Sequence, residues 1–196
     1  MHHRFGMQQI RSFIAIPLPT PLQKMAVHLM QRMAEVGPNI RWVPAETMHL
    51  TLKFLGDVEN TEIPAVCEKI DEVCQSIEPF RLGIAGSGAF PNEEKPKVLW
   101  LGINEGREEL IRLATGIERA LADLGFKPEP RDYRPHLTLG RAGRGRVPQA
   151  VMEILREARQ ATVGDFTADS VQLFASYLDK HGPTYNVMAT SPLGDF

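Results

Sequence analysis

The chain carries the tetrapeptide His-Leu-Thr-Leu twice, at residues 49–52 and 136–139. Histidine accepts or donates a proton near neutral pH, with an unperturbed pKa of about 6.5. Threonine adds a small hydroxyl that can donate a hydrogen bond to an anion. Two such pairs have the composition of an acid-base site with anion-binding hydroxyls. We therefore expect an active site that is built from two matching halves.

Both tetrapeptides have the pattern of a β-strand with one polar and one apolar face. Side chains at positions i and i+2 of a strand point to the same side, so each histidine projects together with the threonine two residues later. The intervening leucines then face the core: Leu50, Leu52, Leu137 and Leu139. If the two strands face each other across a cleft, two imidazoles and two hydroxyls meet there.

This set of groups suits a phosphodiester. One of the two histidines, His49 or His136, can deprotonate the attacking oxygen while the other protonates the leaving oxygen in line. Thr51 and Thr138 can donate hydrogen bonds to the nonbridging oxygens. Neither step requires a metal ion, and we expect no cofactor.

The fifth residue after the histidine differs between the two halves. Arg141 holds this place in the second half, where its guanidinium could neutralise charge on the phosphoryl oxygens. Strict alternation would turn Arg141 away, but a bulge or turn at Gly140 would return it to the cleft. Phe54 holds the place in the first half and could stack on a nucleobase, with Lys53 expected on the face of His49. We therefore expect one half to recognise the nucleoside and the other the phosphate.

Hydrophobic periodicity predicts the elements that position these residues. Besides the second tetrapeptide, strands are expected at residues 13–16, 49–55, 80–85, 98–103, 171–177 and 185–189. Four amphipathic helices are expected from apolar stripes: Leu22, Met25, Ala26, Leu29 and Met33; Val66, Ile70, Val73 and Ile77; Leu110, Ala114, Ile117, Leu121 and Leu124; and Ile154, Leu155 and Ala158. This mixed order favours an α+β fold with antiparallel sheets in two similar lobes. No linker divides the lobes, so we expect residues 1–196 to form a single bilobal domain.

Composition and charge limit the expected partners. The chain is 43% hydrophobic and 23% charged, as is usual for a globular protein. Its net charge is -2, so any nucleic-acid contact must come from a local basic site. An excess of basic residues surrounds the second tetrapeptide. Positions 127–146 contain two acidic residues and six basic ones: Lys127, Arg131, Arg134, Arg141, Arg144 and Arg146. Arg144 and Arg146 fit either a solvated loop or an RNA contact.

The two cysteines favour a reducing compartment. Cys67 and Cys74 fall on one predicted helix about 10 Å apart, which is too far for a disulfide. No apolar run has the length of a membrane span, and the N-terminus lacks a signal-peptide pattern. We expect a cytoplasmic monomer without membrane contact.

In their wider context the two motifs resemble the two-histidine phosphoesterase superfamily, and in particular the RNA 2',3'-cyclic phosphodiesterase family, historically called 2'-5' RNA ligase. The first motif extends over Trp42-Val43-Pro44 to Gly56 and the second over residues 134–141. The resemblance continues through residues 11–16, 90–100, 176–178 and 182–185. It therefore spans nearly the whole chain.

The resemblance implies a bilobal fold with both motifs facing a cleft, and hydrolysis of 2',3'-cyclic phosphate ends of RNA or nucleotides to 2'-phosphates. Carried onto the matching positions, His49 would protonate the leaving O3' and His136 would activate water. Thr51, Thr138 and Arg141 would hold the phosphate. The near symmetry of the motifs lets either histidine take either part. The same site run backward would join a cyclic end to a 5'-hydroxyl in a 2'-5' linkage.

Other interpretations compete with this one. A zinc site needs three or four ligands, and neither motif supplies a second close histidine or a carboxylate. A noncatalytic RNA-end or nucleotide binding module would keep the cleft without turnover, although simple binding does not require two titratable groups. Among substrates, linear 2'-5' oligonucleotides and ADP-ribose 1'',2''-cyclic phosphate stay open. Trp42 and Phe54 are each expected in the core or a lid, and Tyr185 in a hairpin, with substrate contact as the alternative.

Overall fold

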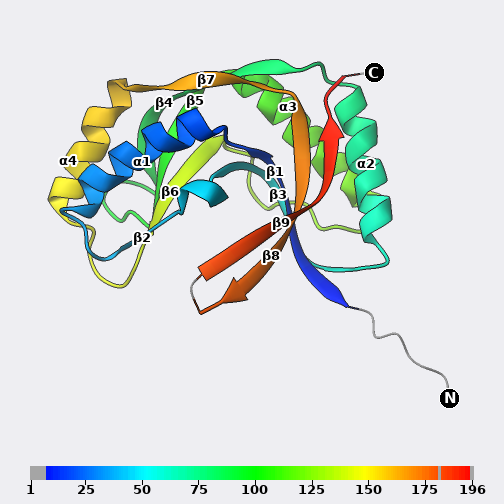
Figure 1. Cartoon of the computed structure of the whole chain (residues 1–196), viewed down its shortest axis with the longest axis horizontal. Helices are drawn as coiled ribbons and strands as arrows, with labels where there is room; N and C mark the ends of the chain where they lie inside the picture. The colour runs from blue at the N-terminus through cyan, green and yellow to red at the C-terminus, as the bar shows by residue number, and fades with distance from the viewer. Residues whose placement is uncertain (1–7, 181, 195–196) are drawn as a thin grey trace.

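The computed structural model describes residues 8–180 and 182–194 of the chain, and within them nine strands form two antiparallel sheets flanked by four α-helices (Figure 1). The α+β class expected from the sequence is confirmed. The elements are β1 (Gln9–Pro17), α1 (Thr20–Ala34), β2 (Ile40–Trp42), β3 (His49–Glu59), α2 (Ile63–Gln75), β4 (Phe80–Phe90), β5 (Val98–Glu105), α3 (Arg107–Ala122), β6 (His136–Ala142), α4 (Gln149–Glu157), β7 (Thr162–Ala168), β8 (Ser170–Asp179) and β9 (Gly182–Pro192).

Each sheet contains one of the two motif strands. The first sheet has the strand order β3-β1-β8-β9, so the first motif lies on an edge strand. The second sheet has the order β2-β6-β5-β4-β7, so the second motif lies between two neighbours. Both motif strands lie between two helices, as expected, but strand β2 and a short 3₁₀ helix (Ala45–Thr47) replace the simple loop expected before β3.

Helices α1 and α3 each pack on one sheet although the strand before them belongs to the other sheet. Helices α2 and α3 pack together, and they contact β3, β8 and β9 of the first sheet. Helices α1 and α4 also pack together, and they contact β2, β4 and β7 of the second sheet (Figure 1). Yet α1 follows β1 of the first sheet, and α3 follows β5 of the second. The chain therefore passes repeatedly from one half to the other, which agrees with the lack of a linker.

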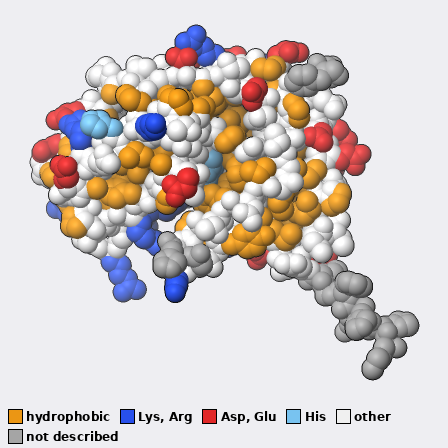
Figure 2. Space-filling view, viewed as in Figure 1, with side chains coloured by type: hydrophobic (Ala, Val, Ile, Leu, Met, Phe, Trp, Pro, Cys, Tyr) orange, Lys and Arg blue, Asp and Glu red, His pale blue; other side chains and the backbone are white. Residues whose placement is uncertain are grey.

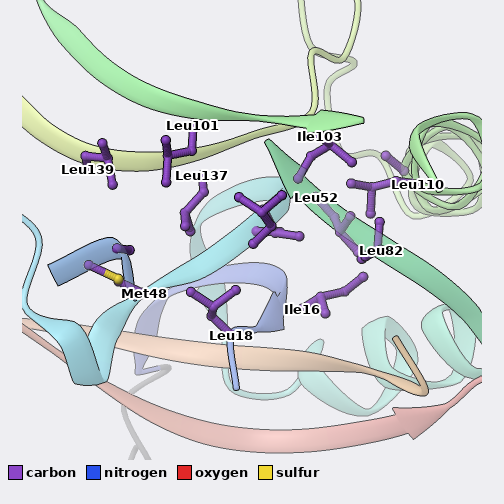
Figure 3. Close-up of a cluster of buried hydrophobic side chains, with 14 of the residues drawn as sticks. Ile16, Leu18, Met48, Leu52, Leu82, Leu101, Ile103, Leu110, Leu137 and Leu139 are labelled. Carbon is purple, nitrogen blue, oxygen red and sulfur yellow. The ribbon is translucent and has the colours of Figure 1, made fainter. Parts of the chain in front are cut away.

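The leucines of both motifs lie in one continuous core. Leu50, Leu137 and Leu139 are fully buried and Leu52 is nearly so. Figure 3 shows Leu52 of β3 in the same cluster as Leu137 and Leu139 of β6. Each such leucine contributes roughly 1.5–3 kcal/mol of burial free energy. The motif strands are thus anchored against each other through a shared core.

Several strand boundaries differ from the prediction. β3 does not end at Leu55 as predicted but continues to Glu59, because a bulge with Gly56 at a φ of 72° keeps the strand paired with β1. β4 continues beyond Ala85 to Phe90. β2 and β7 were not predicted at all. Both are edge strands of the second sheet, where pairing with a neighbour decides the conformation.

Two helical predictions are also corrected. Met25 does not belong to the core stripe of α1, because its side chain is 53% exposed and Met30 is buried in its place. The predicted helix ends are also too late, since Ile77, Leu124 and Ala158 lie beyond the ends of α2, α3 and α4. Cys67 and Cys74 share α2 as predicted, and both are free thiols. No helix of the described residues combines the length and the hydropathy needed to cross a membrane.

Candidate active site

Both motif strands contain a β-bulge at the same place. In β3 the pairing register shifts between Thr51 and Lys53, and in β6 it shifts between Thr138 and Gly140. Each bulge adds one residue to the motif strand and so moves the alternation of side chains by one position. The fifth residue after each histidine therefore returns to the face of that histidine.

The predicted bulge at Gly140 is confirmed, and it turns Arg141 toward the cleft. A Cβ at Gly140 would lie 2.8 Å from the indole ring of Trp42 and 2.9 Å from a methyl carbon of Ile40. Glycine is therefore required by the close approach of β2. Burial lowers the pKa of both His49 and His136, and the charge of Arg141 lowers the pKa of each further.

The predicted place of Lys53 on the face of His49 is wrong. The bulge in β3 carries no glycine, and it turns Lys53 into the interior, where its side chain is 2% exposed. Phe54 takes the outward place instead and is 58% exposed. Its ring centroid lies 6.1 Å from that of Phe13, which in turn lies 4.7 Å from the ring of His49.

Each of the two histidines is oriented by a hydrogen bond to the backbone carbonyl two residues before it. The Nδ1 atom of His49 lies 2.6 Å from the carbonyl oxygen of Thr47, and that of His136 lies 2.7 Å from the carbonyl oxygen of Arg134. A carbonyl oxygen can only accept, so each Nδ1 carries the hydrogen. This fixes the tautomer and leaves each Nε2 free for a substrate.

The environment favours the neutral form of both imidazoles. Burial lowers the pKa of His49 and of His136, and the positive charge of Arg141 lowers both further. The hydrogen bonds to the carbonyls of Thr47 and Arg134 oppose this effect without cancelling it. An anion bound between the histidines would favour the protonated form of the nearer one.

The two motif strands are held face to face. β3 and β6 contact each other, and the hydroxyl of Tyr133 donates a hydrogen bond of 2.9 Å to the carbonyl oxygen of Thr51. Thr51 and Thr138 are half-buried, like the two histidines. The structure therefore brings the predicted pairs and Arg141 together from different sheets.

Aromatic rings surround His49. The rings of Phe13 and Tyr185 lie 4.7 Å and 5.5 Å from it, and Phe174 lies 6.2 Å away. Tyr185 belongs to the β8–β9 hairpin as predicted, and it also lines the site. Phe13 was predicted only as a buried strand residue, because the apolar run at 13–16 shows no alternation that would mark the functional face.

A cavity of about 250 Å³ adjoins the His49 half of the site. Phe13, Phe54 and Tyr185 line it, together with the polar side chains of Arg11 and Ser176. The combination of aromatic faces with a cation and a hydroxyl suits a flat heterocycle that carries hydrogen-bonding groups.

The His136 half has a different lining. The ring of Phe90 meets His136 edge to face at 4.9 Å, and Trp100 packs against Phe90 at 5.1 Å. Arg41 is the partner of Arg141 across β2 and β6, so the two guanidinium groups leave the sheet on the same face. Arg41 was missed because β2 was not predicted.

The basic character of this half continues into the loop after β6. Figure 2 shows Lys and Arg side chains at the lower left, where the loop beyond β6 lies in Figure 1. Among the ion pairs of the described residues, none includes Arg41, Arg141, Arg144 or Arg146. These charges are therefore available to an anionic ligand. In the described part of the chain, no group of three or more His, Cys, Asp or Glu side chains could hold a metal ion.

Known proteins resemble this chain over nearly its whole length. The RNA 2',3'-cyclic phosphodiesterase of Aeropyrum pernix is 34% identical over 160 residues, which cover 82% of this chain and 90% of that protein. The protein of the same name from Methanothermobacter thermautotrophicus is 32% identical over 180 residues, covering 92% and 97% of the two chains.

Solved structures share the fold. TT0787 of Thermus thermophilus aligns with a TM-score of 0.79 and 26% identity, covering 95% of this chain and 100% of that one. E. coli LigT complexed with 3'-AMP aligns with a TM-score of 0.76 and 25% identity, covering 95% and 99%. The sequence profile of the 2'-5' RNA ligase superfamily matches residues 21–180. The chain therefore belongs to the 2'-5' RNA ligase superfamily.

Proposed function

We propose that this protein is an RNA 2',3'-cyclic phosphodiesterase that hydrolyses cyclic phosphate ends of RNA or nucleotides to 2'-phosphates. The observation that carries the proposal is the matched orientation of two imidazoles, each with Nδ1 bound to a carbonyl and Nε2 free, beside the shared guanidinium of Arg141. Relatives named RNA 2',3'-cyclic phosphodiesterase support the same reaction.

In the proposed mechanism, the two histidines move two protons in one displacement. His136 Nε2 takes a proton from water as the water oxygen attacks phosphorus. The bond between phosphorus and O3' breaks, and His49, which carries a proton on both nitrogens once the anionic substrate is bound, donates its Nε2 proton to O3'. The 2'-phosphate remains on the ribose. Proton exchange with solvent then restores both histidines.

Thr51, Thr138 and Arg141 are proposed to hold the nonbridging oxygens. Each hydroxyl lies two residues from its histidine on the same strand face, and the bulge brings Arg141 to that face. Charge on these oxygens grows in the transition state, where one well-placed donor is worth about 10²–10³ in rate. The mechanism assigns no step to a metal ion.

The nucleoside is proposed to occupy the cavity beside His49. Phe54 presents an exposed ring at its wall, and Phe13 and Tyr185 separate the cavity from His49. The same site run in reverse would give a 2'-5' linkage. We also propose that one domain, residues 1–196, works as a cytoplasmic monomer, since a single chain supplies both motifs and both cysteines are free.

The test is a product analysis in EDTA. The protein is incubated with a nucleoside 2',3'-cyclic phosphate, and the monophosphate isomer is identified by chromatography. A 2'-phosphate supports the proposal, whereas a 3'-phosphate would change the leaving group. Measurable binding without any product would favour the alternative, a noncatalytic RNA-end or nucleotide binding module.

A further inference from the structure

Lys53 is the only charged side chain among the buried residues of the described chain. It lies four residues after His49, and the bulge in β3 turns it into the interior. Its ammonium group donates to Glu118 Oε2 at 2.7 Å and to the carbonyl oxygen of Lys127 at 3.1 Å. Burial of a charge is costly unless it is paired and hydrogen-bonded. The ammonium group of Lys53 is both paired and hydrogen-bonded. What its two partners hold in place indicates why a charge is buried here.

Both partners of Lys53 lead to the segment before the second motif. The second carboxylate oxygen of Glu118 accepts a hydrogen bond of 2.7 Å from the backbone N–H of Glu129. Residues 127–135, which we name the approach segment, contain no helix or strand and run directly into His136. Lys53 and Glu118 together therefore fix the beginning of the approach segment to β3 and α3.

The end of the approach segment is attached to β3 as well. Tyr133 donates its hydroxyl hydrogen to the carbonyl oxygen of Thr51 at 2.9 Å. The next residue, Arg134, supplies the carbonyl oxygen that orients His136. The place of that carbonyl thus depends on contacts made by the strand of the first motif.

We propose that Lys53 is a positioning residue, which through Glu118 holds the approach segment so that the Arg134 carbonyl orients His136 relative to His49. This inference rests on the proposed function. It explains a difference between the two motif strands. The fourth residue after His49 is Lys53, whereas the fourth residue after His136 is Gly140, which has no side chain that could hold a segment. His49 needs no such support, because Thr47 belongs to a short 3₁₀ helix that closes locally.

The test combines kinetics with the tautomer of each histidine. Lys53→Met keeps the length of the side chain and removes the charge. Since small misplacements of a catalytic group cost up to about 10²-fold, we expect kcat for a nucleoside 2',3'-cyclic phosphate to fall about 10- to 100-fold with KM within about twofold. In ¹⁵N correlation spectra, His136 changes from the pure Nδ1–H tautomer to a mixture, while His49 is unchanged.

Two controls make the test specific. Lys69→Met breaks an exposed ion pair of the same length, 2.7 Å, with Glu72 and should change neither kcat nor the tautomers. If Lys53→Met does not fold, two other variants test the attachment: Glu118→Gln removes the counter-charge of Lys53 but keeps an acceptor of the same shape, and Tyr133→Phe removes the hydrogen bond at the other end of the approach segment. Both should give the same changes.

A His136 that keeps its Nδ1–H tautomer in the folded variants, with kcat unchanged, would overturn the proposal and leave Lys53 a purely structural ion pair. The spectra need no substrate. If the unmodified protein hydrolyses no cyclic phosphate, the proposed function fails, while the tautomers still decide the role of Lys53.

Discussion

Arg141 belongs to a strand of the second sheet, yet its charge lowers the pKa of His49 on a strand of the first. It acts in the same direction on His136, its neighbour on β6. Burial is the larger cause of the lowered pKa at both histidines, and this one guanidinium adds to it at each. In the proposed function, it also offers a bidentate contact to a phosphate bound between them.

Replacement of Arg141 by glutamine should move the pH profile of kcat/KM. Without the positive charge, the pKa of each histidine rises. The acidic limb, where the base becomes protonated, and the alkaline limb, where the acid loses its proton, both shift to higher pH. The rate should also fall about 10²–10³-fold because a transition-state donor is lost. Arg141→Lys keeps the charge, so its limbs should stay near those of the unmodified protein. Limbs that do not move in Arg141→Gln would contradict the electrostatic role.

Removal of either imidazole should stop turnover without unfolding the protein. We expect His49→Ala and His136→Ala each to lose at least about 10²–10⁴ in kcat/KM, the range for one general acid or base. Thermal unfolding should show that the fold persists, and EDTA should leave the unmodified protein active. His28→Ala, on the exposed side of α1, is the matched control. Retained hydrolysis in either site variant would refute the two-histidine mechanism.

The same histidines should make the protein less stable in acid. Their pKa values in the folded state lie below the unfolded value of about 6.5, so the unfolded state binds protons first. The free energy of unfolding therefore falls as pH drops from about 6.5 through the lowered folded values. The double variant His49→Asn/His136→Asn lacks this loss. Urea unfolding at pH 7.5 and 5 should show a smaller difference for the variant, and equal differences would argue against buried neutral histidines.

Truncation of Phe54 should weaken substrate binding more than it slows the chemistry. Stacking of one base on an aromatic ring is worth about 1–3 kcal/mol, so Phe54→Ala should raise KM roughly 5- to 150-fold with little change in kcat. Phe54→Trp should bind well. Met25→Ala removes another exposed apolar side chain, one that does not line the cavity, and serves as the control. An unchanged KM for Phe54→Ala would mean that the base does not lie on this ring.

The sequence allowed the motif faces and one bulge to be predicted, because period-2 alternation and a glycine are local signals. The bulge at Gly140 was foreseen on that basis. The matching bulge in β3 has no glycine, and so Lys53 and Phe54 could not be assigned to their true faces. The register between β1 and β3 decides those faces, and register depends on residues far apart in the chain.

The missed features share this dependence on distant partners. β2 has only three residues, Ile40–Trp42, and pairs with β6 about a hundred positions later. β7 pairs with β4 across a similar gap. Phe13 lies in a run that is apolar on both faces, so periodicity could not show that its ring meets His49. The hydrogen bonds of the approach segment were missed as well, because no sequence motif identifies the side chains that make them.

The exchange of helices between the halves has a consequence for any attempt to divide this protein. A fragment that ends after α2 would hold the first motif, but it would lack α3, which packs on β3, and also β8 and β9, which complete the first sheet. The remainder would hold the second motif without α1 and β2. Although the two motifs look like copies, neither fragment contains the complete cover for its own sheet. The duplicated parts are interlocked, and the protein can be expected to fold and to lose its fold as one cooperative unit.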